Sequence, residues 1–335
     1  MDTQRNSLSQ APVFALAYCH RDVDAARRWL AWTGFLSRET EPELRHDLVV
    51  MRTQRMKVEV LPADISGVQV VQAVCPDEDE RGYPGSATHL FIRTLEFCNK
   101  RYPGRPVMFC EADTVALKPK WMDAISAEYA KCGRPFMGFH VTTSVRPHMA
   151  GCGVYPASWR SLSPLLAGIL DAPRDSALFG KDKGQAWDIY AAAEVEPQMA
   201  HSKTIQQIWQ PGLWLSAKGM GRLSPGAALF HQDKEGSLIR LLNRERFGGR
   251  FDWSFAKDAK PFFMLEAPTE RLIVKGETFI GFRKVARGPS GLVSIHQSDD
   301  PAESMILRSM CGRFGLSQID EAEYRALEKQ APRLR

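Results

Sequence analysis

The sequence predicts an α/β protein with a mostly parallel sheet and helices on both of its faces. Its apolar runs are short and rich in valine, as in buried strands, and they lie at residues 13–18, 47–51, 58–61, 68–74, 106–110 and 136–140. Segments with a helical apolar stripe alternate with these runs, at residues 24–32, 86–102 and 121–129. Strands that alternate with helices in this way are typical of a doubly wound sheet.

Two of the expected helices carry local signals of their own. The first follows the polar turn after the opening strand and presents Trp29, Leu30 and Trp32 on one stripe, which is the spacing of a helix that packs one face. For the second, Ser86 offers an N-cap, and the turn-forming residues 102–104 end the apolar stripe. Both helices are therefore expected to cover the sheet.

The pattern of alternating strands and helices in the sequence changes after residue 149. Glycine-containing loops and short helices, at 186–193 and 237–246, replace the regular alternation. Beyond Pro268 the pattern predicts three strands followed by two helices, at residues 272–274, 278–282, 292–296, 301–313 and 321–330. Because 335 residues exceed the usual length of one domain, roughly 100–200 residues, we expect a main domain over 1–267 and a small C-terminal β/α module over 268–335.

Composition describes an ordinary folded protein. Hydrophobic residues make up 44% of the chain and charged residues 25%, values that exclude a disordered class. The seven cysteines are scattered and odd in number, which favours reduced core thiols over a disulfide framework; they are Cys19, Cys75, Cys98, Cys110, Cys132, Cys152 and Cys311. Residues 1–10 are polar and no long apolar run follows, so the sequence predicts a soluble cytoplasmic protein without a membrane span.

The net charge of +5 is concentrated in one part of the chain. Between Arg240 and Arg287 eleven Lys or Arg residues stand against six Asp or Glu residues. A solvated basic face is the simple interpretation of such a stretch, and a surface for a polyanion is the functional one. The second interpretation makes a nucleic acid or an acidic glycan a candidate partner.

Glu111 and Asp113 come directly after the apolar run 106–110. Open α/β sheets bind ligands just past the carboxyl ends of their strands, because the loops diverge there. With one residue between them on an extended chain, the two side chains point the same way and can approach one divalent ion. Such an ion would neutralise a diphosphate leaving group, although surface carboxylates would give the same spacing.

The segment 109–123, FCEADTVALKPKWMD, resembles the DxD segment of GT-A glycosyltransferases. Two further segments fall in the order of that family: MAGCGVYP at 149–156, similar to its glycine-containing acceptor loop, and LFHQDKEGS at 229–237, similar to its late His-x-x-Lys element. The resemblance covers about residues 13–242. It implies a Rossmann-like GT-A sheet, a nucleoside-diphosphate sugar as donor, and Mn²⁺ or Mg²⁺ as cofactor.

The resemblance also implies roles for single residues. Asp113 and His231 match the metal ligands, whereas Glu111 stands where the family has its first aspartate and either touches the ion or organises water and the sugar. Lys234 matches a lysine that pairs with the donor diphosphate. The other donor-side candidates are Tyr18, His20, Arg21, Ser86 and His89. The acceptor-side candidates are Gly151, Gly153, Tyr155 and Trp187.

An inverting transferase needs a carboxylate that takes the proton of the acceptor. Asp188 is the best candidate because it follows the acceptor segment and lies beside aromatic residues that can stack on a sugar or a base. An aspartate in the first turn of a helix is also common without any catalytic role. Asp182 and Glu194 are the competing carboxylates.

The usual signals of other enzyme classes do not occur in the sequence. It has no GxxxxGK[ST], no GxGxxG after the first strand, no HExxH and no GxSxG. For the acceptor, the basic stretch favours a polyanion, and DNA with hydroxymethylated pyrimidines, as in modified phage DNA, would fit a protein in a host cytoplasm. The cations expected to touch its phosphates are Arg240, Arg244, Arg246, Arg250, Lys257 and Lys260.

Two alternatives to a DNA acceptor remain open. One is transfer to a surface polysaccharide or to a protein, where the basic stretch meets acidic glycan or only water. The other is a nucleic-acid-binding module that has no activity and merely keeps the transferase scaffold. Metal-dependent hydrolysis of a donor would argue against this second alternative.

Overall fold

The structure is a computed structural model of the 335-residue chain. It describes residues 11–54, 65–77, 82–142, 146–171, 186–207, 223–231, 233 and 236–252, together with short strands between 271 and 319. The chain divides into two compact units, Met1–Ile208 with Leu223–Phe251 and Trp209–Arg222 with Asp252–Arg335. The first unit contains the large sheet.

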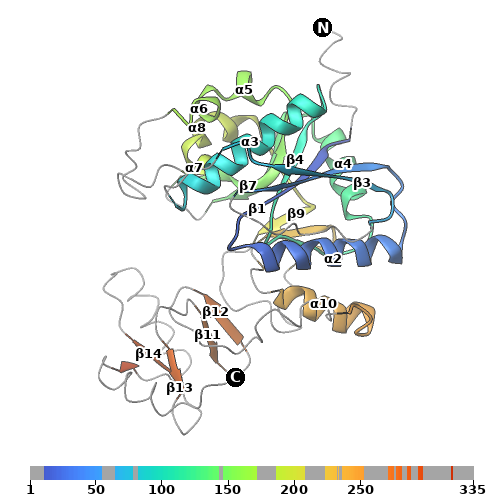
Figure 1. Cartoon of the computed structure of the whole chain (residues 1–335), viewed down its shortest axis with the longest axis vertical. Coiled ribbons are helices and arrows are strands. Elements are labelled where there is room, and N and C mark those ends of the chain that lie inside the picture. The colour runs from blue at the N-terminus through green and yellow to red at the C-terminus, as the bar shows by residue number, and fades with distance from the viewer. Residues whose placement is uncertain are drawn as a thin grey trace. The chain divides into compact units, whose positions relative to one another are not determined.

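The centre of the first unit is a seven-stranded sheet in the order β3-β2-β1-β4-β7-β6-β8 (Figure 1). Its strands are β1 (Val13–Tyr18), β2 (His46–Arg52), β3 (Val68–Val74), β4 (Val107–Glu111), β6 (Phe136–Val141), β7 (His148–Tyr155) and β8 (Met199–His201). Four of the six neighbouring pairings are parallel, and β7 is antiparallel to both of its neighbours. The predicted α/β class with a mostly parallel sheet is confirmed.

Helices cover both faces of this sheet (Figure 1). The long ones are α2 (Val23–Glu39), α3 (Gly85–Arg101) and α4 (Trp121–Cys132), whereas α10 (Ser237–Phe247) packs against α2. Short helices follow β7, namely α5 (Trp159–Leu162), α6 (Pro164–Ala167), α7 (Trp187–Tyr190), α8 (Ala192–Val195) and the 3-10 turn η1 (Glu196–Gln198). The helices predicted near 24–32, 86–102, 121–129 and 237–246 are confirmed.

Strand β1 is buried along its whole length, which explains why its sequence is a continuous apolar run rather than an alternating one. Val13, Ala15 and Ala17 belong to the core that includes Phe91 of α3. Phe14 points to the other face, where its ring centroid lies 5.2 Å from that of Trp121 in α4. The alternation of side chains along β1 thus feeds two separate packed layers.

A second, three-stranded sheet has the order β5-β10-β9 and contains β5 (Val115–Ala116), β10 (Leu229–His231) and β9 (Ile205–Gln207). The indole of Trp29 donates a 2.8 Å hydrogen bond to Thr114 Oγ1, and the indole of Trp32 donates one of 2.7 Å to the Ala116 carbonyl. The helical stripe read from the sequence therefore serves to hold the chain that follows β4. This small sheet brings β10 beside that chain.

The second unit contains two small sheets in the described residues. Strands β11 (Arg271–Val274) and β12 (Glu277–Ile280) pair antiparallel, while β14 (Val293–His296) pairs with β13 (Val285–Arg287) and β15 (Gln318–Ile319). Of the strands predicted at 272–274, 278–282 and 292–296, the described residues 272–274, 278–280 and 293–296 are confirmed as strand. The predicted helices at 301–313 and 321–330, like the predicted strand at 58–61, lie outside the described residues. A domain boundary at 267 stays a prediction.

Two local predictions are wrong. Helix α3 begins at Gly85 after Pro84 and has no side-chain cap, so Ser86 lies within its first turn. Residues 149–156 were expected to form a glycine-containing loop, but almost all of them belong to the buried strand β7. Glycine is needed at 153 because a Cβ there would lie 2.9 Å from the Met137 carbonyl of the neighbouring strand. These glycines allow a close approach within the sheet and do not mark a turn.

Among the described residues, no helix is both long and apolar enough to cross a membrane. The cysteines of this part of the chain are all free thiols; Cys75, Cys98, Cys110 and Cys152 are buried as expected of core thiols, whereas Cys19 and Cys132 are only half-buried. Cys311 lies outside the described residues.

Candidate metal centre and active site

The ends of β4 and β10 bring together Glu111, Asp113 and His231, which we call the acid–His231 cluster. The Nε2 atom of His231 lies 3.3 Å from Asp113 Oδ1 and 3.5 Å from Glu111 Oε2. One possible ligand atom from each residue lies within 4.8 Å of those of the other two. Residues from distant parts of the sequence, predicted together only through a family resemblance, thus converge at one point.

Gln207 fixes the orientation of His231. The last residue of β9, it lies beside the last residue of β10, and its Oε1 is 3.0 Å from His231 Nδ1. An amide oxygen only accepts, so the amide as placed assigns the proton to Nδ1 and turns Nε2 toward the two carboxylates. A metal-binding histidine is typically held by such a hydrogen bond at its other nitrogen.

The electrostatics of the cluster favour a cation. Burial disfavours a charged imidazole, but the carboxylates of Asp113 and Glu111 outweigh that effect and raise the pKa of His231 well above its usual value. A proton on Nε2 therefore supplies a positive charge between the two carboxylates. A divalent ion at that place would meet two carboxylates and one imidazole.

The main chain of Asp113 is tied to the start of α10. The Asp113 carbonyl accepts a 2.7 Å hydrogen bond from the backbone N–H of Asp233. The Asp233 carboxylate in turn accepts bonds from the N–H groups of Leu238 and Ile239, at 3.0 and 3.4 Å. It thereby satisfies donors at the first turn of α10, as a capping carboxylate does. Asp233, just before α10, is thus positioned by the same loop that carries Asp113.

Gly151 of β7 lets an aromatic ring approach the cluster. A Cβ at this position would lie 2.5 Å from Trp187 Cζ2 and 3.1 Å from Glu111 Oε1. The Trp187 ring stacks on Phe91, and its Nε1 donates a 3.2 Å hydrogen bond to the hydroxyl of Tyr155. Both Trp187 and Tyr155 are buried and belong to the core on this side of the sheet. Their predicted contacts with an acceptor, like those of Gly151 and Gly153, stay predictions.

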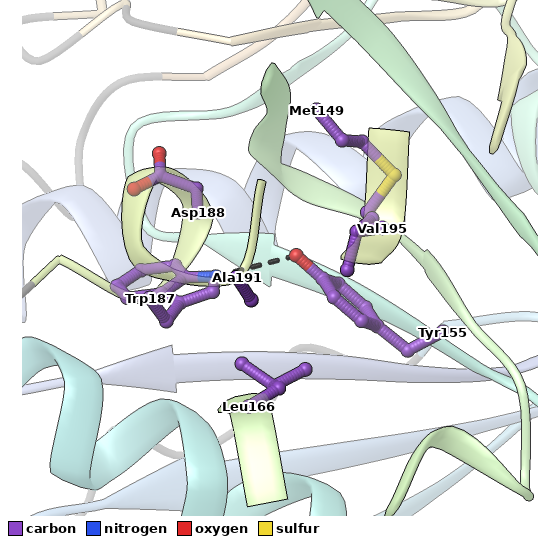
Figure 2. A pocket seen from close by; sticks show the side chains of 7 residues that line it. All are labelled: Met149, Tyr155, Leu166, Trp187, Asp188, Ala191 and Val195. Atoms are coloured by element: carbon purple, nitrogen blue, oxygen red, sulfur yellow. Dashed lines mark hydrogen bonds between the residues drawn. The ribbon is translucent and has the colours of Figure 1, made fainter. Parts of the chain in front are cut away.

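Asp188 is one of the residues that line a small cavity; the others are Met149, Tyr155, Leu166, Trp187, Ala191 and Val195. Figure 2 shows its carboxylate pointing away from the rings of Trp187 and Tyr155. Burial raises the pKa of Asp188; Glu111 adds to that effect, whereas His148 and backbone hydrogen bonds oppose it. A carboxylate with a raised pKa is a stronger base than an ordinary one, which suits proton abstraction.

The competing carboxylate Glu194 is engaged elsewhere. It accepts hydrogen bonds from Ser163 Oγ at 2.6 Å and from the Leu165 N–H at 2.9 Å. These contacts join α8 to the start of α6, which gives Glu194 a structural use. Asp182 and Lys234 lie outside the described residues, and their roles stay predictions.

The predicted donor residues lie at two places. Tyr18 is the buried last residue of β1, and His20 and Arg21 follow it on the exposed turn before α2. Ser86 and His89 belong to α3, where His89 is buried and its Nε2 lies 3.0 Å from Asp77 Oδ1. Their contacts with a nucleotide stay predictions.

A second group of metal-ligating types surrounds His89. The possible ligand atoms of Cys75, Asp77 and His89 also lie within 4.8 Å of one another, and we call this group the Cys75 cluster. Here Arg93 binds the Asp77 carboxylate, with Nη2 2.6 Å from Oδ2 and Nε 3.0 Å from Oδ1. The hydrogen bond from Arg93 lowers the pKa of Asp77, so this carboxylate is already balanced by a guanidinium.

Tyr83 and Gln207 were missed by the sequence interpretation. Tyr83 precedes α3 and is 68% exposed, and loss of solvation together with the carboxylates of Asp188, Glu111 and Asp113 raises its pKa to about 12. An exposed ring near three acids is a candidate wall of the donor site. Its only sequence signal is an aromatic residue between Gly82 and Pro84.

The basic stretch divides in the structure. Arg250 binds Glu39 through both carboxylate oxygens, Arg246 donates to the Leu117 carbonyl, and Arg244 contacts Glu245. Burial lowers the pKa of Arg240, which is opposed by the nearby Asp233. Lys257 and Lys260 lie outside the described residues. Arg246 and Arg250 therefore already serve the packing of α10 and the chain after it.

No protein-family model matches the chain, and no curated protein matches it. Among solved structures, one that is similar is mouse xyloside xylosyltransferase 1 in its apo form. It has 10% sequence identity and a TM-score of 0.42, and the match covers 66% of this chain and 97% of the other.

Proposed function

We propose that this chain is a metal-dependent glycosyltransferase that takes a sugar from a nucleoside-diphosphate donor. The observation that carries the proposal is the convergence of His231 with Glu111 and Asp113 at the carboxyl end of β4. A nucleoside diphosphate bound at this end of a mostly parallel sheet would lie where such sheets bind their ligands. The motif order read from the sequence supports the same reaction.

Asp113 and His231 would hold the ion, and Glu111 would either join them or orient the sugar. A bound divalent cation supplies Lewis-acid stabilisation to the departing diphosphate. Gln207 keeps His231 Nε2 directed at the ion site, and Trp29 and Thr114 hold the loop that carries Asp113. The chain's own contribution is thus a rigid set of ligands, held from three elements.

Asp188 is our general base for an inverting transfer. The acceptor hydroxyl would lose its proton to this carboxylate as its oxygen bonds to the anomeric carbon. Asp188 belongs to the helix that carries Trp187, whose ring approaches Glu111 across Gly151. That Asp188 and Glu111 both neighbour Trp187 supports their assignment to one site. Asp188→Asn should reduce transfer about 10²–10⁴-fold while the donor KM stays near normal.

For the acceptor, we propose DNA with hydroxymethylated pyrimidines, on the basis of the charge excess between Arg240 and Arg287. Phosphate contacts would make binding weaken steeply with salt, at a log–log slope of about −0.9 for each neutralised phosphate. Because Arg246 and Arg250 join α10 and the chain after it to other parts of the first unit, their replacement would also disturb packing, and the exposed Arg240 and Arg244 are changed instead. Arg240→Glu with Arg244→Glu should flatten the salt dependence and leave donor hydrolysis unchanged.

The deciding experiment screens purified protein against a panel of sugar nucleotides and detects free nucleoside diphosphate. We expect release with at least one donor, its loss with a chelator, and its return with Mn²⁺ or Mg²⁺. Modified DNA, unmodified DNA and an oligosaccharide panel are then offered with that donor. Sugar on the oligosaccharides alone would reject the DNA acceptor and keep the transferase. Absence of release and transfer with every donor would reject the transferase.

A further inference from the structure

His148 lies beside the proposed base and has a defined orientation. It is the first residue of β7, its side chain is buried, and its Nδ1 lies 2.7 Å from the Arg146 carbonyl. A carbonyl oxygen can only accept, so Nδ1 carries the proton of this hydrogen bond. The other nitrogen, Nε2, faces Asp188 with 3.8 Å between it and Oδ2.

The described groups that face Asp188 come from several elements. His148 and Tyr155 approach from β7, Glu111 from the end of β4, and Tyr83 from the turn before α3. Only His148 among these can carry a positive charge. Apolar side chains of Met149, Ala191 and Val195 complete the wall of the small cavity. A charge on Asp188 is therefore poorly solvated and depends on its polar neighbours.

Because Nδ1 of His148 already donates to the Arg146 carbonyl, only Nε2 can exchange a proton with Asp188. If Asp188 is ionised, a proton on His148 Nε2 points at it; if Asp188 is protonated, Nε2 offers a lone pair toward it. At 3.8 Å the two atoms are beyond hydrogen-bond distance, so a small closure is needed to share the proton. Catalytic hydrogen bonds are often long before the substrate binds.

We propose that His148 is the positioning residue of Asp188, orienting its carboxylate and receiving through it the proton that the acceptor hydroxyl gives up. This rests on the proposed transferase function. The acceptor oxygen forms a bond to the anomeric carbon, the bond from that carbon to the diphosphate breaks, and its electron pair leaves with the diphosphate. The acceptor proton moves to Asp188 and is then shared with His148 Nε2, so the step needs no other reactant.

The protein offers a matched histidine pair outside this arrangement. His140 of β6 lies with its Nε2 3.5 Å from Glu196 Oε1, where the carboxylate is 41% exposed. Asp188 is 23% exposed and its histidine only 8%. The two pairs have similar separations but differ in burial, which makes His140→Gln the control for His148→Gln. Glutamine retains an amide donor but cannot take up a proton.

The test compares steady-state kinetics of His148→Gln, His140→Gln and the wild type as a function of pH. A general base contributes about 10²–10⁴-fold, and for its partner we expect a fall in kcat of about tenfold. The donor KM should not change. His148 Nε2 is a second site in the pair that can bind the proton, so its removal leaves Asp188 alone to bind it and should move the acidic limb of kcat/KM to lower pH. His140→Gln should match the wild type in all three respects.

A His148→Gln enzyme with wild-type kcat and an unmoved acidic limb would overturn the proposal. If that variant does not fold, the nitrogen-15 resonance of His148 Nε2 provides a second test. It should shift in Asp188→Asn and stay in place in Glu196→Gln; an unmoved resonance in Asp188→Asn would also overturn it. If the wild type transfers no sugar, the proposed function fails, whereas the resonance still reports whether the two side chains are coupled.

Discussion

The molecule places two histidine and carboxylate clusters at the carboxyl ends of its parallel strands, and they differ in how the negative charge is balanced. In the Cys75 cluster, Arg93 binds Asp77 through both oxygens and continues to Glu96. In the acid–His231 cluster, two carboxylates share one imidazole whose pKa they raise. Similar side chains therefore have different uses: Arg93 supplies the positive charge in one cluster, and an added cation suits the other.

Ligand geometry alone does not distinguish these clusters, because both bring their possible ligand atoms within 4.8 Å of one another. The supporting residues do. Gln207 orients His231 as a ligand, whereas the nitrogen of His89 that faces Asp77 is used in a hydrogen bond to a carboxylate already bound by arginine. The comparison predicts that metal affinity depends on the acid–His231 cluster alone.

The largest expected effect on Mn²⁺ affinity comes from replacing the histidine of each cluster with alanine. His231→Ala should weaken Mn²⁺ binding by more than about 100-fold, since loss of a group that merely orients a ligand already costs about 10–100-fold. His89→Ala should leave the affinity unchanged. Calorimetric titration with Mn²⁺ measures both. Equal losses in the two variants would break the distinction between the clusters.

The next effect concerns the hydrogen bond that orients His231. Gln207→Leu should weaken Mn²⁺ binding about 10–100-fold, because the imidazole loses the partner at Nδ1. Gln206→Leu is the matched control: the neighbouring residue of the same strand bonds Ser224 through both ends of its amide, at 2.7 and 3.0 Å. The same titration should give wild-type affinity for the Gln206 variant. An unaffected Gln207 variant would remove this residue from the site.

How much of this comparison the sequence could predict depends on the kind of contact. The strand before Glu111 and the Trp29 and Trp32 stripe are local patterns, and the structure contains both elements as expected. The convergence of His231 with Asp113 was predicted only from the order of the motifs. The small sheet that joins them has strands of only two or three residues, which are too short to give a local pattern.

Other features depend on contacts that no local pattern records. The pairing of His148 with Asp188 joins two residues 40 positions apart through side chains alone. Gly151 and Gly153 suggested a loop because glycine usually weakens a strand, yet close neighbours on adjacent elements require them there. Nothing in the local sequence around Arg93 indicates that it binds Asp77, 16 positions away.

A pH dependence should sharpen the comparison further. The pKa of His231 is raised in the metal-free protein, so a metal that takes Nε2 must displace a proton there. Below that pKa, Mn²⁺ affinity should fall about tenfold for each unit of decrease in pH, with about one proton released. Titrations in two buffers of different ionisation enthalpy count the proton. Binding without proton release at neutral pH would mean that His231 Nε2 is not a ligand.

The smallest expected effect is a gain of binding at the Cys75 cluster. Arg93→Ala removes the guanidinium from Asp77, a carboxylate that is 45% exposed. Surface ion pairs are worth about 0–1 kcal/mol, so affinity of this cluster for Co²⁺ should rise only a few-fold. A thiolate-to-cobalt absorption band from Cys75 reports it, and the band should vanish in Arg93→Ala with Cys75→Ser. An equally strong band in the wild type would show that Arg93 does not prevent metal binding.

The central claim is that the acid–His231 cluster holds the cation that transfer requires. The most direct measurement compares Mn²⁺-stimulated release of nucleoside diphosphate by Asp113→Asn and Asp77→Asn after removal of bound metal with a chelator. Each change replaces one carboxylate oxygen with an amide NH₂ group and leaves the size of the side chain nearly constant. The account predicts that Asp113→Asn loses the stimulation. Asp77→Asn should keep the stimulation, even if the donor KM of this variant changes. Stimulation of Asp113→Asn to the wild-type rate at the same Mn²⁺ concentration would contradict the account.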